Sequence, residues 1–325
     1  MQQTKSPGSH YVPKVYLKKF VNRNGKLFRA NKASKKQTRL KDFHPSAICY
    51  QPGFYEFSSK HPLKGYIVAE PNYLEDRGFL YENKLNKWID KVISPTEVVS
   101  TQDAYDLAVT LFNLKVRNPF YREHSFSEQS INFSIDKILA EEKQSWNLGE
   151  SVAQLRNVPY ELFTQIVEHL RHEWINDPNF SKELHNRSLL ENLENPSQIR
   201  LWVYYKLTAA KWVIYKTTIN HQFICSDNPG YCIDEENKVH NIRFGGRCTF
   251  VFPLTSYHAL AIIADDDDIK ELPVVKPIQH IQATSDLVKI INQATWIVAN
   301  KHVYAAYEQS ILQTWYAMNG SGLII

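Results

Sequence analysis

The spacing of apolar residues changes character along this chain. From about residue 72 to residue 220 they recur every three or four positions, which is typical of amphipathic helices. This spacing predicts helices from about residue 72 to the residue before Pro95, from Thr101 to about Asn118, over 127–145, 159–176 and 181–193, and from Pro196 to Ile214. The second helix must end near Asn118, because Pro119 disfavours helical geometry in the residue before it.

After residue 220 the pattern is that of short strands separated by turn residues. The predicted strands are Gln222–Cys225, Gly230–Ile233, Val239–Phe244, Cys248–Pro253 and Ala259–Ile263. A helix capped by Ser285 follows, and Val303–Ala306 begins either a strand or a helix. Because helices and strands are segregated along the chain, this order favours an α+β fold over a doubly wound parallel sheet.

Near the N-terminus the pattern predicts a short helix and a hairpin. Pro13 suits the first turn of a helix, Asn24-Gly25 marks a turn, Leu27–Ala30 has strand character, and a short strand is plausible at Phe54–Phe57. We therefore expect a single domain over 1–325. It comprises a basic N-terminal helix–hairpin segment (1–70), a helical part (72–220) and a part (221–325) with a mixed or antiparallel sheet and a final helix.

Composition places the chain among folded proteins of a reducing compartment. Hydrophobic residues make up 43% of the chain, which is enough for a real core. The N-terminus lacks the pattern of a secretory signal, and the longest apolar stretch, Phe250–Ala264, is too short to span a bilayer. The four cysteines are sparse and unevenly spaced, which fits reduced thiols better than a disulfide framework. We therefore expect a cytoplasmic protein with no membrane association.

The positive charge is concentrated at the N-terminus. Residues 1–43 contain twelve Lys or Arg and one acid, Asp42, so that 12 − 1 = +11, and the remainder carries 4 − 11 = −7. A basic arm can hold a polyanion through release of counterions, which makes nucleic acid a candidate partner and Lys35, Lys36 and Arg39 candidate binding residues. The alternative is a solvated lysine-rich hairpin that keeps the chain soluble.

Two proline-containing blocks carry the strongest candidates for a site. His10 precedes Pro13 and can act as a base or an acid near neutral pH, or simply bond to the backbone; Tyr11 and Tyr16 are candidate binding residues beside it. Asp227 and Asn228 stand between a strand and Pro229, where a carboxylate suits catalysis. The alternative for Asp227 is an Asx-turn, in which the side chain bonds its own backbone.

The other polar candidates are more ordinary. Arg117, at a helix end, can clamp a phosphate or carboxylate, or complement the helix dipole on the surface. Glu75 and Glu82 would share a helix face, but this spacing is common on solvated helices, and we favour that interpretation. His169-x-x-His172-Glu173 has a spacing that could hold zinc on one helix turn, but the sequence nominates no third strong ligand, so we assign no metal site. The cofactor stays open, although the sequence contains no glycine-rich phosphate loop or dinucleotide fingerprint.

Several short motifs together resemble one bacterial family. They are His10-Tyr11-Val12-Pro13 with Tyr16-Leu17 and Phe20, Phe54-Tyr55, Leu74-Glu75, Arg117-Asn118-Pro119, Phe223–Pro229, Phe252-Pro253-Leu254-Thr255, and Asn292 with Val303-Tyr304-Ala305. The pattern resembles the family known as domain of unknown function 4238, in which Thr is usual where this chain has Asn118 and Cys225. The resemblance implies a bacterial or phage-type, soluble, single-domain protein, and it implies no settled activity.

Two functional hypotheses follow. The first is a hydrolase acting on nucleic acid, such as a defence or toxin-type nuclease, with His10 as general base or acid, Asp227 orienting it or a metal, and Arg117 stabilising charge on phosphate. The second is a non-enzymatic module that binds nucleic acid or protein, in which the proline blocks are packing devices. An active site requires His10, Arg117 and Asp227 to converge in one cleft.

Overall fold

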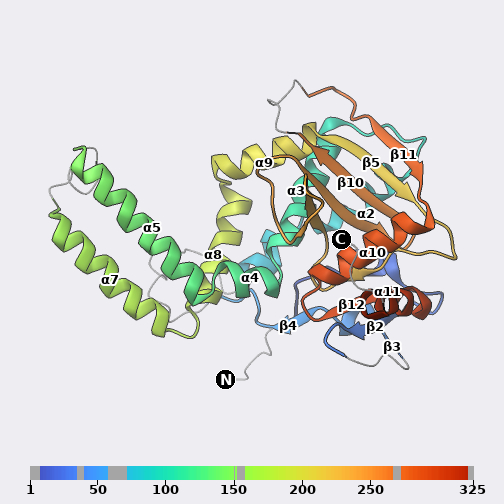
Figure 1. Cartoon of the computed structure of the whole chain (residues 1–325), viewed down its shortest axis with the longest axis horizontal. Helices are drawn as coiled ribbons and strands as arrows, with labels where there is room; N and C mark the ends of the chain where they lie inside the picture. The colour runs from blue at the N-terminus through green and yellow to red at the C-terminus, as the bar shows by residue number, and fades with distance from the viewer. Residues whose placement is uncertain are drawn as a thin grey trace.

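The computed structural model describes residues 8–34, 40–57, 72–149, 151, 158–265 and 272–320. The fold is α+β, as predicted: short N-terminal strands come first, helices follow, and a mixed sheet with two helices completes the chain (Figure 1). None of the helices in these ranges combines the length and the apolar character needed to cross a bilayer. The four cysteines are buried, free thiols.

The N-terminal part supplies two small sheets. Its elements are β1 (Gly8–His10), α1 (Lys14–Leu17), the 3₁₀ turns η1 (Lys18–Phe20) and η2 (Pro45–Ala47), β2 (Leu27–Asn31), β3 (Lys41–Phe43) and β4 (Tyr50–Pro52). Strand β1 pairs with β4. The strand predicted at Phe54–Phe57 is wrong, because the chain turns at Gly53, which has a φ of 61°. Phe54 and Tyr55 instead pack their rings into the core.

The helical middle follows the predicted pattern with local shifts. It contains the π-helical turn η4 (Leu74–Gly78), α2 (Glu82–Ile93), α3 (Thr101–Val116), α4 (Pro119–Ser125), α5 (Glu128–Asn147), α7 (Tyr160–Asn176), α8 (Phe180–Glu194) and α9 (Gln198–Ala209). Helix α3 ends just before Asn118, as Pro119 requires. Its N-cap is Ser100, one residue before the predicted start, because the Ser100 hydroxyl accepts from the Asp103 N–H.

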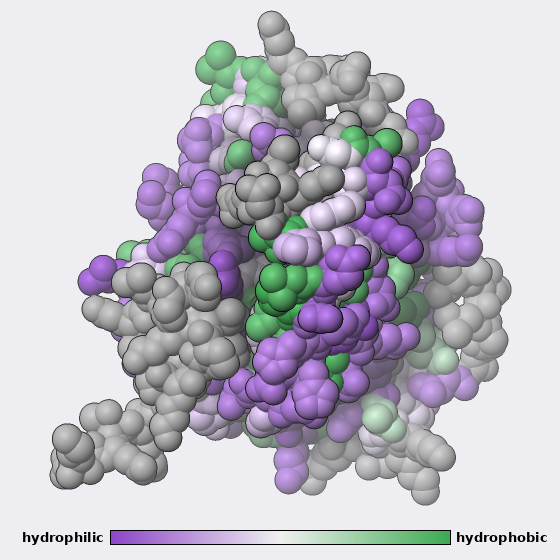
Figure 2. All heavy atoms as spheres, turned by 90° about the vertical axis from the view of Figure 1, so that its left-hand side faces the viewer, coloured by the Kyte–Doolittle hydropathy of each residue, from purple (hydrophilic) through white to green (hydrophobic). Residues whose placement is uncertain are grey.

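Helices α5 and α7 form a hairpin that projects from the body (Figure 1). Among the residues of these two helices, Ile135 alone is buried. Large apolar side chains such as Phe133, Leu162 and Ile166 are exposed on the hairpin. Figure 2 views the molecule from this side and shows apolar side chains gathered between polar ones.

A six-stranded mixed sheet forms the C-terminal part. Its order is β11-β5-β10-β9-β7-β8, in which β11 runs parallel to β5 and the other pairs are antiparallel. The strands are β5 (Lys211–Lys216), β7 (Tyr231–Asp234), β8 (Val239–His240), β9 (Cys248–Thr255), β10 (His258–Ala264) and β11 (Ile278–Gln282). The helix predicted to reach Ile214 is therefore wrong at its end. It stops at Ala209 because Trp212-Val213-Ile214 are strand formers buried within the sheet.

Two strands from the C-terminal part of the chain return to the N-terminal part of the fold. Strands β6 (Cys225–Ser226) and β12 (His302–Ala305) join β2 and β3 in a four-stranded sheet of order β3-β2-β12-β6. Helices α10 (Ser285–Val298) and α11 (Glu308–Gly320) follow β11 and β12. Thr284, and not Ser285, caps α10, since its hydroxyl accepts from Leu287 N–H. This sheet brings the Ser226–Pro229 block beside the N-terminal strands.

Candidate functional site

Three proline-containing blocks meet in one place, which we call the junction: His10–Pro13, Lys115–Pro119 and Ser226–Pro229. Asn228 is at its centre and is fully buried. Its Oδ1 accepts from Asn118 Nδ2 (2.9 Å) and Lys115 Nζ (2.8 Å), and its Nδ2 donates to Val298 O (2.6 Å) and Asn241 Oδ1 (2.8 Å). The amide is thus fully engaged within the protein. The ligand-binding role predicted for Asn228 stays a prediction, and these contacts favour a structural role.

Lys115 is a buried cation that sequence reasoning missed. Its Nζ donates to Gly230 O (2.6 Å) as well as to Asn228. Burial lowers the pKa of Lys115 to about 7. The signal in the sequence was its position four residues after Leu111, on a helix face that is otherwise apolar.

Arg117 is also buried, and its guanidinium holds the first block in place. Nε donates to Tyr11 O (3.1 Å), Nη2 donates to His10 O (2.8 Å), and Nη1 forms an ion pair with Glu82. Burial by itself would lower the pKa of Arg117, but the Glu82 carboxylate raises it. The phosphate-stabilising role predicted for Arg117 stays a prediction, while these contacts make it a positioning residue for His10 and Tyr11.

The interpretation of Glu75 and Glu82 as solvated carboxylates is wrong. The Glu82 side chain is 18% exposed, and burial raises its pKa although Arg117 acts in the opposite direction. Burial also raises the pKa of Glu75, again against the effect of Arg117. Both carboxylates therefore lie near Arg117. This proximity places η4 and the start of α2 beside the junction.

Asp227 is held by the chain segment that precedes β12. Its carboxylate accepts from the N–H groups of Asn300 (2.8 Å), Lys301 (2.8 Å) and His302 (2.9 Å). Burial raises the pKa of Asp227 to about 6, while the three backbone N–H groups favour the carboxylate and act in the opposite direction. The Asx-turn alternative does not account for these three partners, which are distant in sequence, although the carboxylate also bonds the Asp227 backbone itself. The Ser226 hydroxyl makes a further local bond, since it accepts from the Asn228 N–H (3.2 Å).

The aromatic residues of the first block have different surroundings. Tyr16 is fully buried and donates its hydroxyl to Pro253 O (2.7 Å), so the structure places this predicted binding residue in the core. The His10 ring lies 5.6 Å from the Tyr50 ring, centroid to centroid. Tyr11 is partly buried and packs against Phe54.

A cavity of about 390 Å³ opens at the junction. We call it the junction cavity, and its lining consists of Tyr11, Tyr50, Gln51, Pro52, Pro119, Glu123, Asp227, Asn300 and Lys301. Tyr11 and Asp227 therefore meet there, although about two hundred residues separate them. Neither His10 nor Arg117 is among the lining residues, and Arg117 instead bonds the backbone of Tyr11. Across the described ranges, no group of three His, Cys, Asp or Glu side chains is arranged to hold a metal ion.

The basic N-terminal segment is described in part. Lys35, Lys36 and Arg39 lie outside the described residues. Several other basic side chains contact protein groups: Lys19 pairs with Asp90, Lys26 pairs with Asp42, Lys32 donates to two backbone carbonyls, and Arg29 lies over the Phe43 ring. These contacts use part of the positive charge on which the nucleic-acid hypothesis depends.

Comparison with known proteins identifies a family. The model of the family described as "Protein of unknown function (DUF4238)" matches residues 9–309, which include all three junction blocks. No curated protein and no solved structure matches the chain significantly.

Proposed function

This chain belongs to the DUF4238 family, and we propose that it binds a small polar ligand in the junction cavity. One observation carries the proposal: Tyr11 and Asp227, from two blocks far apart in the family match, line the same cavity. A cavity of this volume, with a few convergent polar groups, is typical of small-molecule sites.

The contacts of the blocks favour binding over catalysis. The polar groups of Lys115, Arg117 and Asn228 bond to the protein itself, so they stiffen the wall behind the cavity. Asp227 is held in place by the backbone N–H groups of Asn300, Lys301 and His302, so it presents a fixed carboxylate at the cavity wall.

The charge of the cavity defines the class of ligand. Among the residues that line the cavity, Asp227 and Glu123 supply two carboxylates and Lys301 supplies one cation. This excess of negative charge favours a ligand that carries hydrogen-bond donors, such as an amine or a guanidine.

Calorimetric titration with agmatine, and with 1,4-butanediol as a neutral probe of similar length, tests this proposal. We expect agmatine to bind and the diol not to. Glu123→Gln should lower the affinity for agmatine by about twofold to fivefold, as expected for loss of an ion pair at the rim of the cavity. Glu161→Gln, an exposed carboxylate on α7, is the matched control. Equal weakening by both substitutions, or no binding of agmatine, would contradict the proposal.

The second candidate is the hydrolase acting on nucleic acid. It is favoured by the pKa of Asp227 near 6, which suits a general base or acid close to neutral pH. In this mechanism His10 assists as acid or base, and Arg117 acts by positioning the His10 backbone.

Cleavage of single-stranded DNA and RNA, together with toxicity on expression, tests the hydrolase. His10→Ala and Asp227→Asn should abolish both effects. Nucleic-acid affinity should fall with salt, and replacing Lys35, Lys36 and Arg39 by alanine should flatten the slope by about one unit for each phosphate that these side chains neutralise. This candidate would be eliminated if the wild-type protein neither cleaves nor binds single-stranded DNA or RNA at low salt.

A further inference from the structure

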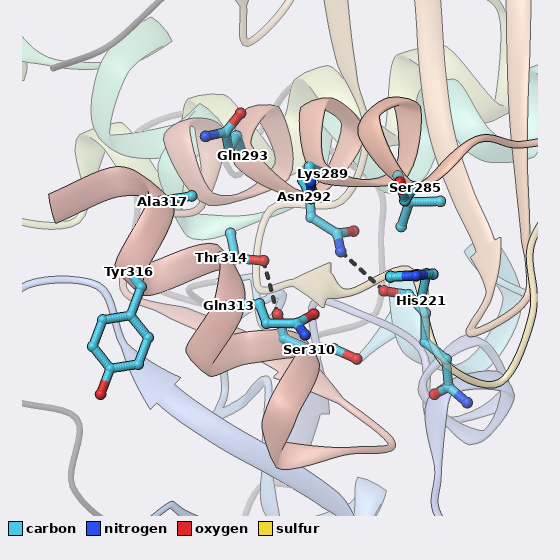
Figure 3. A pocket seen from close by; sticks show the side chains of 12 residues that line it. His221, Ser285, Lys289, Asn292, Gln293, Ser310, Gln313, Thr314, Tyr316 and Ala317 are labelled. Atoms are coloured by element: carbon cyan, nitrogen blue, oxygen red, sulfur yellow. Dashed lines mark hydrogen bonds between the residues drawn. The ribbon is translucent and has the colours of Figure 1, made fainter. Parts of the chain in front are cut away.

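A second cavity lies between α10 and α11, away from the junction. Its volume is about 410 Å³, and it shares no lining residue with the junction cavity. Figure 3 shows His221 on the loop before β6, facing the gap between the two helices, and Ser310 and Gln313 of α11 turned towards the same space. We call it the helix cavity.

The lining of the helix cavity is largely apolar surface, with polar and basic side chains set into it and no acid. Hydroxyl groups and amides supply most of the polar lining, and Lys289 and His221 add basic groups; the full polar set is His221, Gln222, Ser285, Lys289, Asn292, Gln293, Ser310, Gln313, Thr314 and Tyr316. Among the described residues, no Asp or Glu lines it. Its lining thus carries basic groups and no carboxylate, unlike that of the junction cavity, although Asp286 pairs with Lys289.

The back wall of this cavity is fixed by hydrogen bonds. Asn292 donates to Gln222 O (2.9 Å) and accepts from the Ile224 N–H (3.1 Å). Thr314 donates its hydroxyl to Ser310 O (2.8 Å) within α11. These bonds tie α10 to the loop that carries His221, so the site is formed before a ligand arrives, which lowers the entropy cost of binding.

Lys289 is available to an incoming anion. Its Nζ lies 2.9 Å from Asp286 Oδ1, but this is a surface pair whose side chains are 60% and 80% exposed. Such pairs are weak, because water and salt screen both charges. A phosphate group carries more charge and more acceptor oxygens than one carboxylate, so it competes well for the ammonium group.

We propose that the helix cavity binds a small phosphate ester of a polyol, such as a sugar phosphate. Lys289 and His221 hold the phosphate, and the amides on the opposite wall, such as Gln313, bind hydroxyl groups. Amide side chains suit that role because each one can donate and accept.

Calorimetric titration of the full chain with ribose 5-phosphate, ribose and inorganic phosphate tests the proposal. Ribose 5-phosphate should bind more tightly than either of the other probes. Lys289→Gln should lower the affinity for ribose 5-phosphate by about tenfold, as expected for loss of a charged hydrogen bond. Lys137→Gln, an exposed lysine on α5, is the matched control and should leave the affinity unchanged.

A second variant separates the two halves of the ligand. Gln313→Ala should lower the affinity for ribose 5-phosphate and leave the affinity for inorganic phosphate unchanged. The proposal is overturned if no probe binds at up to about 10 mM, the weakest affinity of interest here. It is also overturned if ribose binds as tightly as its phosphate, or if Lys289→Gln and Lys137→Gln have the same effect.

Discussion

Gly230 offers the sharpest test of how the junction is built. It directly follows Pro229, has a φ of +77°, and accepts the hydrogen bond from Lys115 through its carbonyl oxygen. A Cβ atom added there would lie 2.5 Å from Cδ2 and 2.9 Å from Cε2 of Phe252. The Phe252 ring is fully buried in β9, so it has little room to move.

The cost of Gly230→Ala can be estimated from two terms. A left-handed backbone costs an alanine about 1–2 kcal/mol. Overpacking against a buried ring adds about 1–3 kcal/mol. We therefore expect the free energy of unfolding to fall by about 3 kcal/mol. Gly25 provides the control: its φ is +71° and no atom lies within 4 Å of its added Cβ, so Gly25→Ala should cost about 1 kcal/mol, from the backbone term alone.

Urea denaturation of the wild type and both variants measures these values, provided that the m-value is unchanged. The difference between the two variants isolates the overlap with Phe252. In a Gly230→Ala background, Phe252→Leu should cost less than it does in the wild type, because it relieves the overlap. Losses for the two glycines that agree to within about 0.5 kcal/mol would refute the reasoning.

Two further predictions concern buried charges. Glu82→Gln leaves the Arg117 guanidinium buried without its partner and should lower the unfolding free energy by about 3–5 kcal/mol, whereas the exposed Asp90→Asn should change it by less than about 1 kcal/mol; urea denaturation compares the two, and equal effects would contradict the buried pair. Because the folded pKa of Lys115, about 7, lies below its unfolded value near 10.4, the unfolded chain binds an extra proton between these values. Stability should therefore rise with pH from about 7 to 10, with a slope of up to about 1.4 kcal/mol per pH unit, and the contribution should vanish in Lys115→Met. Identical pH profiles for the two proteins would count against it.

Some features of this protein follow from neighbouring residues alone. The end of α3 before Pro119, the strand at Leu27–Asn31 and the separation of helices from strands are all visible in the sequence. Each depends on a proline, a turn or a periodic pattern, whose effect acts over a few residues. The family resemblance, carried by short motifs, is confirmed over residues 9–309.

Other features were decided by tertiary packing. The seven-residue spacing of Glu75 and Glu82 is the same on a solvated helix as on a buried one, so only the packing of α2 against the junction shows that Glu82 pairs with Arg117. The partners of Asp227 lie more than seventy residues further along the chain. Burial and long-range hydrogen bonds determine the state of such groups, and both depend on elements that are distant in sequence. Local pattern thus identified the proline blocks, and only the fold could place Tyr11 and Asp227 on one cavity.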